Sequence, residues 1–288
     1  MRKKLTCPNP QCTFHQIPGG KFIKHGYFRI RHNHQNMLRY RCQSCNKTFC
    51  AHTFQSTYRQ KKPFLNLVIL SLLCSGQSLR SISRHLNVSY KTVYLKFLWL
   101  MQNCPEDLKI NADTSEIFLD ELESIEHTKC KPVTIGIIVS KDYRLLATNV
   151  GTIPAKGKLA QFSREKYGPR TDQRSDVIEN ILQKAKPYSI MKINSDGHPL
   201  YPKLIKEFLP QAEHEVFIRE EKEKLRDRLH EKKQKKKFDP LFAVNQKCAR
   251  LRSDIKRLVR RSWCTTKKIE NLEGHLKLYL WAQKLGYL

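Results

Sequence analysis

Four cysteines near the N-terminus have the residue type and spacing of a metal site. Four residues separate Cys7 from Cys12, and two separate Cys42 from Cys45. A structural Zn²⁺ takes four soft ligands in a tetrahedron, and two tight turns that each supply a cysteine pair provide that set. Short strands with aromatic and basic residues are expected between the pairs, over residues 21–40. We therefore predict a zinc ribbon on these four cysteines, with ordinary reduced cysteines as the alternative.

The six other cysteines have simpler interpretations. Cys50 and His52 are spare ligands should one of the four be misassigned. Isolated cysteines usually behave as small core hydrophobes, which is our expectation for Cys74, Cys104, Cys130, Cys248 and Cys264. We expect a reducing, cytoplasmic environment, in which clustered cysteines indicate metal before disulfide.

Two aspartates have the setting of a catalytic cation site. Asp120 lies within the apolar stretch FLDEL, and Asp196 lies in NSDGHPLY. Two converging carboxylates repel each other unless a cation lies between them, and Mg²⁺ takes such oxygen ligands. A two-metal site activates water or a 3′-hydroxyl for in-line attack on phosphorus. The alternatives are a turn-forming Asp196 before Gly197 and, in place of Asp120, its neighbours Glu121 and Glu123.

The elements around these aspartates follow an α/β order. We predict strands over residues 116–125, 133–139, 144–150, 188–195 and 213–219. Helices are predicted over 172–186, 199–208 and 268–284, with another long helix beginning at Asp239 and Pro240. Three strands, helix, strand, helix, strand, helix is the order of a ribonuclease-H-like α/β domain with a mixed five-stranded sheet. Asp120 and Asp196 would then lie on neighbouring strands.

A helical segment precedes this domain. Residues 63–75 are apolar, with Pro63 at the start and Gly76 after the end. The following stretch has a first helix, a tight turn at Asn87 and Val88, and a second helix capped by Ser89 and given apolar contacts by residues that include Leu95. This is the helix-turn-helix layout, in which the second helix enters the major groove. The residues expected to face DNA are Tyr90, Lys91 and Tyr94, and a plain helical hairpin within a core is the alternative.

The charge of the chain indicates a polyanionic partner. Lys and Arg number 54 against 26 Asp and Glu, a formal net charge of +28. Residues 1–105 hold 17 of the basic residues and none of the acidic ones. We call residues 1–105 the arm. Its excess of basic residues favours binding to phosphate, which indicates double-stranded DNA as the partner. The most apolar run, residues 64–74, is too short for a bilayer, and the basic N-terminus is followed by Cys and Pro rather than an apolar leader.

We predict three domains: a zinc ribbon at 1–60, a helix-turn-helix at 61–104 and a catalytic domain at 105–288. The last includes a charged insert at about 220–238, within a run that begins at Arg219. Its Lys, Arg and Glu residues favour a solvated helix or a mobile insert over a DNA contact.

Over nearly its whole length, and in order, the chain resembles transposases of the insertion-sequence one (IS-one) family and their relatives. The arm is similar through its CP…C, YRC..C..TF and helix-turn-helix motifs. LDE at residues 119–121 and SDGHPLY at 195–201 resemble the stretches that hold the first and second catalytic aspartates. NQKCARLRSDIKRLVRRSWCTTKK at 245–268 resembles the helix that holds the third carboxylate.

One departure from the family concerns the third ligand. Counting back from Leu251 and Arg252, the position of the family's catalytic Glu is occupied by Asn245. An Asn carbonyl oxygen also binds Mg²⁺, with less charge. Asp239 and Asp254 are nearby substitutes, although Asp239 is better explained as a helix cap and Asp254 is expected to face away. Arg252 lies seven residues on, on the same helix face, where it would grip phosphate or, alternatively, remain a solvated cation.

The resemblance implies a bacterial, nucleoid-associated DNA transposase that cuts at the ends of its own mobile element. The arm would bind terminal inverted repeats, Asp120, Asp196 and Asn245 would hold Mg²⁺ or Mn²⁺, and a homo-oligomer would hold two ends. One alternative is a non-catalytic DNA-binding regulator derived from a decayed or domesticated transposase. Another is a ribonuclease-H-like nuclease without joining activity.

Overall fold

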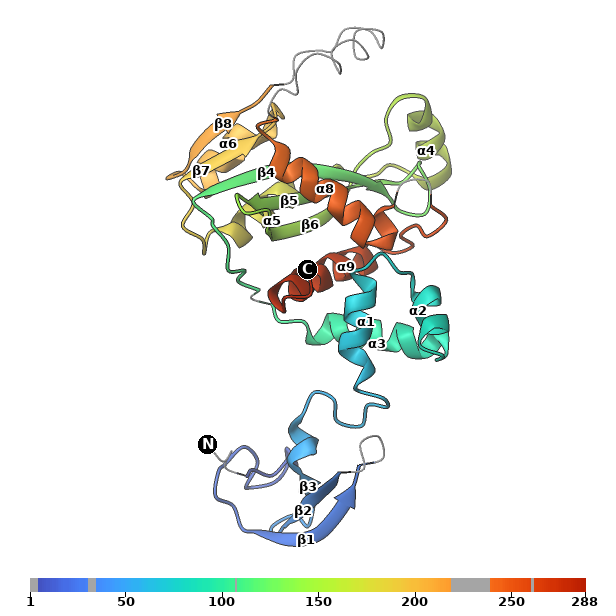
Figure 1. The fold of residues 1–288 in the computed structure, drawn as a ribbon, viewed down its shortest axis with the longest axis vertical. Helices are drawn as coiled ribbons and strands as arrows, with labels where there is room; N and C mark the ends of the chain where they lie inside the picture. Colours follow the sequence, from blue (N-terminus) through green and yellow to red (C-terminus); the bar gives the residue numbers. More distant parts are fainter. Residues whose placement is uncertain (1–4, 31–34, 107, 219–238, 260–261) are drawn as a thin grey trace. The chain divides into compact units, whose positions relative to one another are not determined.

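The structure is a computed structural model that describes residues 5–30, 35–106, 108–218, 239–259 and 262–288. It separates into two compact units, Met1–Leu67 and Val68–Leu288 (Figure 1). The predicted charged insert at 220–238 lies outside the described residues. The three predicted domains stay a prediction, because the compact units divide at a different place.

The first unit is built around a three-stranded antiparallel sheet. Its strands are β1 (Phe22–Arg29), β2 (Asn36–Cys42) and β3 (Thr48–Cys50), in the order β1-β2-β3, followed by a short 3-10 helix, η1 (Ala51–Phe54). Phe49 is buried with the paired cysteines, and the rings of Phe14, Phe22 and Tyr40 pack around them. Because this core is so small, a metal is expected to contribute to its stability.

The second unit begins with three helices. These are α1 (Leu65–Leu73), whose first residues belong to the other unit, α2 (Leu79–His85) and α3 (Tyr90–Asn103). Ser78 and Ser89 cap α2 and α3 by accepting from the backbone N–H three residues on. Asn87 has a φ of 49° and makes the turn between them. Val93 is buried as predicted, whereas Leu95, expected to contact the core, is 54% exposed.

A five-stranded mixed sheet follows, in the order β6-β5-β4-β7-β8. β4 (Glu116–Ile125), β5 (Pro132–Ser140) and β6 (Leu145–Thr152) are antiparallel neighbours, while β7 (Lys192–Ser195) and β8 (Glu213–Val216) are parallel additions. The strand predictions agree closely, except that β7 begins four residues later than expected, at Lys192, and β8 ends at Val216 rather than at residue 219. Eight of the nine residues of β5 are buried, so this strand contributes heavily to the apolar core.

Helices cover both faces of this sheet. α5 (Arg174–Ala185) packs where Gly136 and Gly151 leave room, since a Cβ at either position would meet Val177 within 2.8 Å. On the other face lie α8 (Phe242–Asp254) and α9 (Ile269–Lys284) (Figure 1). α6 (Leu200–Phe208) connects β7 to β8 and packs against α5.

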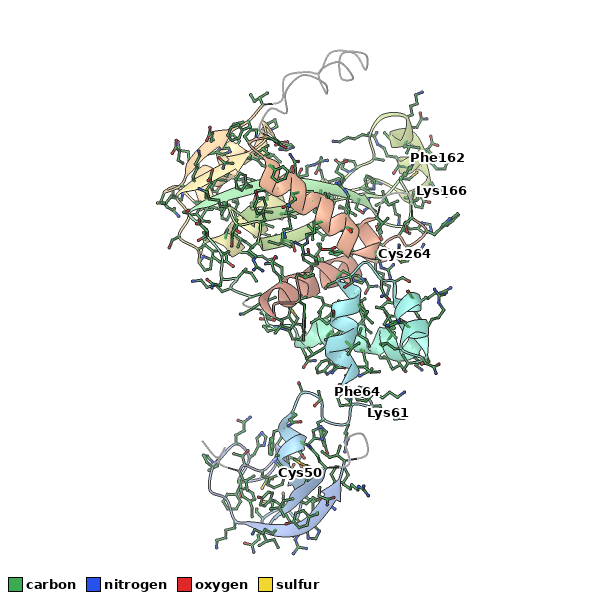
Figure 2. All side chains as sticks on the ribbon, viewed as in Figure 1. Cys50, Lys61, Phe64, Phe162, Lys166 and Cys264 are labelled. Atoms are coloured by element: carbon green, nitrogen blue, oxygen red, sulfur yellow. The ribbon has the colours of Figure 1, made fainter. Side chains whose placement is uncertain are left out.

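One helix was not predicted. η2 (Gly157–Leu159) and α4 (Ala160–Tyr167) form an insert between β6 and α5, and a further short turn, η3 (Lys256–Leu258), follows α8. Phe162 and Lys166 lie on α4 (Figure 2). α8 itself begins at Phe242 rather than at Asp239, because Asp239 makes a turn before the helix by accepting from the backbone N–H of Leu241 at 3.0 Å.

The three N-terminal helices are fastened to the end of the chain. The backbone N–H of Gly76 donates to the carbonyl of Asp254 at 2.7 Å, which joins the α1–α2 turn to the end of α8. The rings of Phe97 on α3 and His275 on α9 lie 4.6 Å apart. These contacts place α3 and the sheet within one compact unit.

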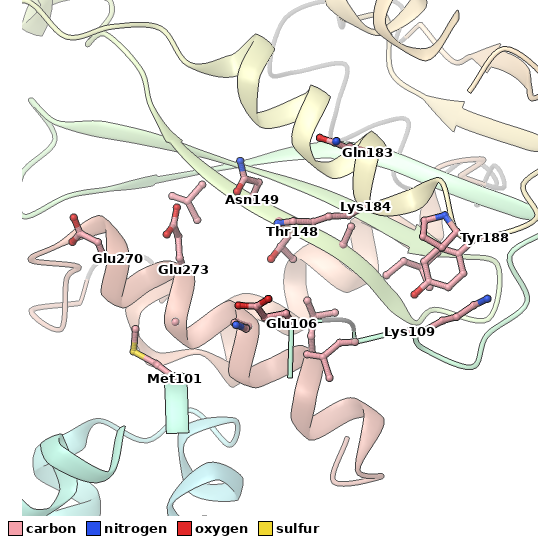
Figure 3. Close-up of a pocket in the computed structure, with 18 residues that line it drawn as sticks. Met101, Glu106, Lys109, Thr148, Asn149, Gln183, Lys184, Tyr188, Glu270 and Glu273 are labelled. Carbon is pink, nitrogen blue, oxygen red and sulfur yellow. The ribbon is translucent and has the colours of Figure 1, made fainter. Parts of the chain in front are cut away.

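A cavity of about 770 Å³ lies where these helices meet the sheet edge. Met101, β6, the end of α5 and Lys277 contribute to its lining (Figure 3). Lys184 crosses it and donates to the carbonyl of Thr148 at 2.8 Å. Its lining excludes Asp120, Asp196 and Asn245, so it is separate from the predicted catalytic residues. Among the described helices, none has the length and apolar character of a membrane span.

Candidate functional site

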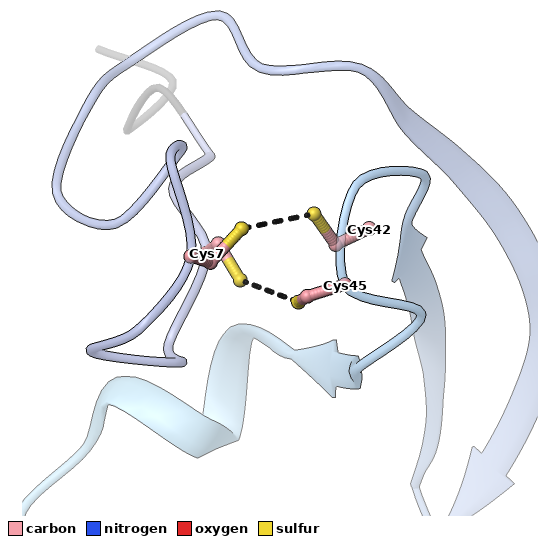
Figure 4. A group of neighbouring side chains, drawn as sticks. Cys7, Cys42 and Cys45 are labelled. Atoms are coloured by element: carbon pink, nitrogen blue, oxygen red, sulfur yellow. Dashed lines mark hydrogen bonds between the residues drawn. The ribbon is translucent and has the colours of Figure 1, made fainter.

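The four predicted cysteines converge in the first unit. Their sulfur atoms all lie within 4.8 Å of one another. Cys7 Sγ lies 3.5 Å from Cys45 Sγ, and Cys12 Sγ lies 3.6 Å from Cys42 Sγ (Figure 4). A tetrahedron with Zn–S bonds of about 2.3 Å has edges of about 3.8 Å, so the cluster fits one Zn²⁺. The prediction of a four-cysteine cluster is confirmed.

Two tight turns present these sulfurs. The N–H of Asn46, whose φ is 58°, donates to the carbonyl of Cys42 and closes the second turn. The N–H of Lys47 lowers the pKa of Cys45 to about 6, which favours the thiolate that a metal needs. Burial acts in the opposite direction on Cys7 and raises its pKa to about 12, so a cation is required to hold the whole set as thiolates.

The spare ligands lie outside this cluster. Cys50 is buried, and its Sγ contacts the Thr53 hydroxyl at 3.7 Å instead. Neither Cys50 nor His52 belongs to the group of converging ligand atoms. Cys74, Cys104, Cys130 and Cys248 are buried as expected of core residues, whereas Cys264 is only half-buried.

Asp120 lies on β4, and Asp196 directly follows the end of the neighbouring strand β7. β4 and β7 pair in parallel with Leu119 opposite Ser195. The next residue on each chain is the aspartate, so the register brings the two backbones within about 4.8 Å of each other where β7 ends. Successive side chains along a strand alternate between the two faces of a sheet, so Asp120 lies on the face opposite to that of Leu119. The predicted neighbouring strands are therefore present.

Each of the two carboxylates accepts a hydrogen bond from a nearby backbone N–H. Asp120 Oδ1 accepts from the N–H of Glu121 at 2.7 Å, and Asp196 Oδ1 accepts from the N–H of His198 at 3.1 Å. Burial is the main cause that raises the pKa of the nearby Tyr201 phenol. Negative charges add to it, and these are on Glu121, Asp120 and Asp196. Tyr201 therefore lies within electrostatic reach of both aspartates.

The rival acids on β4 point to the opposite face. Glu121 pairs in register with Gly136, which faces α5, so Glu121 and Glu123 lie on the α5 side. There Arg174 contacts Glu121 at 3.5 Å, Glu123 at 3.1 Å and Asp172 at 3.0 Å. Burial raises the pKa of Glu121 to about 7, although Arg174 opposes this. These carboxylates form ion pairs with the buried Arg174, a residue that the sequence analysis did not predict to be important.

Asn245 lies in the first turn of α8, on the Asp120 side of the sheet. The negative charge of Asp120 adds to burial in raising the pKa of Cys248, one turn along the same helix. Asn245 Nδ2 donates to Asp239 Oδ2 at 2.8 Å, which turns the amide oxygen away from Asp239. Among the described residues, no third Asp, Glu, His or Cys joins Asp120 and Asp196 in a compact ligand group.

The other helix-borne residues also have defined places. Asp254 accepts from the Tyr279 hydroxyl at 2.8 Å and pairs with Arg250 at 3.4 Å, so this rival ligand is engaged against α9. Arg252 is half-buried on α8. Its predicted grip on a phosphate stays a prediction.

The residues predicted to face DNA lie at the start of α3. Tyr90 is 47% exposed and Lys91 is exposed, while Tyr94 is half-buried. The two tyrosine rings are stacked, with centroids 6.2 Å apart and planes 7° apart. This arrangement presents aromatic faces and one cation at the N-terminal end of a helix, where base edges are contacted in helix-turn-helix proteins.

Comparisons with known proteins identify no family. No family model matches the chain, and no curated protein matches it in sequence. A chain of the cryo-electron-microscopy structure of the simian T-cell lymphotropic virus intasome in complex with PP2A regulatory subunit B56 gamma is similar at a TM-score of 0.27 and 10% identity. The match covers 74% of this chain and 72% of that one. At this TM-score the likeness contributes nothing to the functional argument.

Proposed function

We propose that this protein is a metal-dependent DNA transposase that cleaves strands at the ends of a mobile element and joins them to target DNA. The observation that carries the proposal is the parallel register of β4 and β7, which pairs Leu119 with Ser195, the residues that directly precede Asp120 and Asp196. The sheet order β6-β5-β4-β7-β8 is also the strand order of ribonuclease-H-like domains. The motifs that resemble IS-one transposases supply the reaction class.

Three side chains would hold the divalent cation. Asp120 and Asp196 supply charged oxygens, and Asn245 supplies a neutral one from α8. Bound Mg²⁺ or Mn²⁺ would stabilise the charge that develops during in-line phosphoryl transfer. The hydrogen bond from Asn245 to Asp239 holds the amide in the orientation that leaves its oxygen for this role. Arg252 would hold a phosphate beside the site.

The arm would recognise DNA. The cysteine cluster would hold a structural Zn²⁺ that keeps the first unit folded, and Tyr90, Lys91 and Tyr94 would read or grip the terminal inverted repeats. The absence of acidic residues from positions 1–105 supports this role, because nothing there repels phosphate. Two ends must be held together for joining, so a homo-oligomer is proposed as the active form.

A non-catalytic DNA-binding regulator is the second candidate, and Asn245 is the observation that favours it. An amide in place of a carboxylate lowers the charge that attracts Mg²⁺. A decayed enzyme would keep the arm and its DNA binding while losing cleavage.

The test uses the full chain and duplexes that carry the DNA flanking its own coding region. We expect retarded mobility of these duplexes without Mg²⁺, and strand cleavage and joining products once Mg²⁺ or Mn²⁺ is added. Lys91→Ala should weaken binding, with Lys206→Ala, an exposed lysine on α6, as the matched control. Binding without any product in either metal would favour the regulator, and no preference for the flanking DNA would contradict both proposals.

A further inference from the structure

The insert between β6 and α5 presents an unusual outer surface. Residues 156–170 hold five Lys and Arg and one Glu. On α4 and the turn before it, Leu159 is 39% exposed and Phe162 is 49% exposed. Lys166 lies one turn on from Phe162, with its Nζ 5.5 Å from the ring centroid (Figure 2). We call Leu159, Phe162 and Lys166 the outer face of α4. This face joins apolar groups to cations, and the described residues of the chain leave it exposed.

The other side of α4 is firmly attached. Ser163 is buried, and its hydroxyl donates to the carbonyl of Cys130 at 2.6 Å. Lys131 lies over the Tyr167 ring at 5.1 Å. Arg170 pairs with Glu126 at 3.2 Å, with both side chains largely buried. The insert is therefore held against the β4–β5 turn. Because these contacts fix its inner side, the opposite face of α4 is the one exposed to solvent.

The insert lies at the same end of the sheet as the proposed site, at the C-terminal ends of β4, β6 and β7. β5 is antiparallel to both β4 and β6, and β7 is parallel to β4, so β4, β6 and β7 run in one direction. The insert follows β6 as Asp196 follows β7. The insert and the turn that holds Asp196 therefore both lie at the C-terminal ends of these parallel-running strands.

We propose that the outer face of α4 is a second DNA-holding surface, which binds the duplex on one side of the reacting phosphate. This rests on the proposed function for the identity of the polyanion. Lys156, Lys158 and Lys166 would contact phosphates, and Phe162 would pack into the minor groove, as apolar side chains do in architectural DNA-binding proteins. A second copy of the chain is the less suitable occupant of this face, because the five Lys and Arg of residues 156–170 face only one Glu there, a charge that suits a polyanion.

The strand geometry gives the expected position on DNA. β6 ends at Thr152, which pairs through Val133 with Ser124, four residues beyond Asp120 on β4. At about 3.3 Å per residue, β6 therefore ends roughly 13 Å beyond the level of Asp120 along the strand direction. Duplex DNA rises about 3.4 Å per base pair, so this offset along the strands corresponds to about four base pairs.

A site-specific cross-link in the full chain tests this surface. Photoreactive benzoylphenylalanine replaces Phe162 in one variant and Tyr143 in the control. The side chain of Tyr143 is similarly exposed, at 42%. It lies in the β5–β6 turn, at the opposite end of β6 from the insert. With a duplex of unrelated sequence and no Mg²⁺, we expect position 162 to cross-link to DNA at least ten times more than position 143. Equal yields, or a cross-link from position 162 to a second chain, would overturn the proposal.

The salt dependence of binding gives an independent measurement. Replacing Lys166 by Ala should lower the slope of log affinity against log salt by about 0.9, the value for one lost phosphate contact. Lys284→Ala, in the last turn of α9, should leave the slope unchanged. An unchanged slope in Lys166→Ala would contradict the proposal. Both readouts are independent of cleavage, so a strong cross-link in a chain that cleaves no DNA would sustain this surface while the proposed transposase activity fails.

Discussion

At the residue scale, the distinctive feature of the proposed cation site is that its third ligand, beside Asp120 and Asp196, is the amide of Asn245 rather than a carboxylate. Asn245 is oriented by Asp239, which accepts from its Nδ2 at 2.8 Å. Asp239 therefore serves as a positioning group in this account, and Asp254 is engaged with Tyr279. The third ligand would be the Asn245 oxygen, a weaker donor than a carboxylate.

Substitutions at Asn245 separate a live enzyme from a decayed one. Asn245→Ala removes the oxygen and should abolish cleavage at physiological Mg²⁺, whereas Asn245→Asp restores a charged oxygen and should lower the Mg²⁺ concentration needed. Strand cleavage measured across a Mg²⁺ titration checks this. Activity that appears only in Asn245→Glu would identify a decayed enzyme. Cleavage by Asn245→Ala at the wild-type rate would move the third ligand elsewhere, with Asp239 tested next.

The cysteine cluster gives a second test at this scale. The full chain should contain about one Zn²⁺, and Cys45→Ser should lose it, because a structural site needs all four ligands. Elemental analysis of the purified protein measures this directly. Cys264→Ser, at a half-buried cysteine outside the cluster, should keep the metal. Equal zinc in both variants would contradict the assignment.

At the element scale, the second unit depends on the joint between the α1–α2 turn and α8. Gly76 has a φ of +72°, and a Cβ there would lie 2.6 Å from the carbonyl oxygen of Ser253. That oxygen belongs to the backbone near the end of the helix that carries Asn245 and Arg252. The joint therefore couples the proposed DNA-reading helices to the proposed site.

Gly76→Ala should destabilise this unit by more than the backbone strain alone. Gly157 has a similar φ of +59° with nothing within 4 Å, so Gly157→Ala provides the strain without the clash. We expect Gly157→Ala to cost about 1 kcal/mol and Gly76→Ala to cost about 2 kcal/mol more. Urea unfolding followed by tryptophan fluorescence measures both, since Trp99, Trp263 and Trp281 all lie in this unit. Equal costs would show that the joint tolerates a side chain.

The contact between α3 and α9 predicts a pH dependence. His275 is buried against Phe97, and burial lowers its pKa to about 3 from an ordinary value of 6.5. The unfolded chain therefore binds a proton that the folded chain rejects between these values. Stability should be complete above pH 6.5 and fall as the pH drops, by at most about 1.4 kcal/mol per pH unit from this group.

Unfolding measured at pH 4.5 to 7 by tryptophan fluorescence checks this sign. His275→Gln should flatten the dependence, while His85→Gln, at an exposed histidine on α2, should retain it. A wild-type slope that persists unchanged in His275→Gln would assign the acid sensitivity to other groups.

Much of the sheet could be predicted because its strands are apolar and its helices amphipathic. β4 has the predicted bounds, and β5 and β6 differ from them by a residue or two at each end. α4 was missed because its aromatic residue Phe162 is exposed while its buried residue is the polar Ser163, so the helix lacks an apolar inward face. Leu95 was assigned inward for a similar reason, since buried Lys96 takes a core position on α3.

The site could be predicted only in part. Spacing was enough for the cysteine cluster, because both pairs lie in short local turns. The order of elements along the chain was enough to predict that β4 and β7, which carry or precede Asp120 and Asp196, are neighbours. Arg174 was missed because its three acidic partners come from two different segments, and no local pattern records that convergence.

At the scale of the whole molecule, the charge is divided according to the proposed roles. The acid-free region 1–105 and the basic insert at 156–170 offer two cationic surfaces, and the acids of the chain lie beyond residue 105. The central claim is that Asp120 and Asp196 act together as one cation site.

Cleavage by the single and double aspartate variants tests that claim most directly. Asp120→Asn, Asp196→Asn and the double variant are compared with wild type on duplexes carrying the flanking DNA, with Asp142→Asn in the β5–β6 turn as control. If the two carboxylates hold one cation, either single change should remove cleavage as fully as both together, while DNA binding and the control's cleavage remain at the wild-type level. Cleavage at the wild-type rate by either single variant would contradict the account.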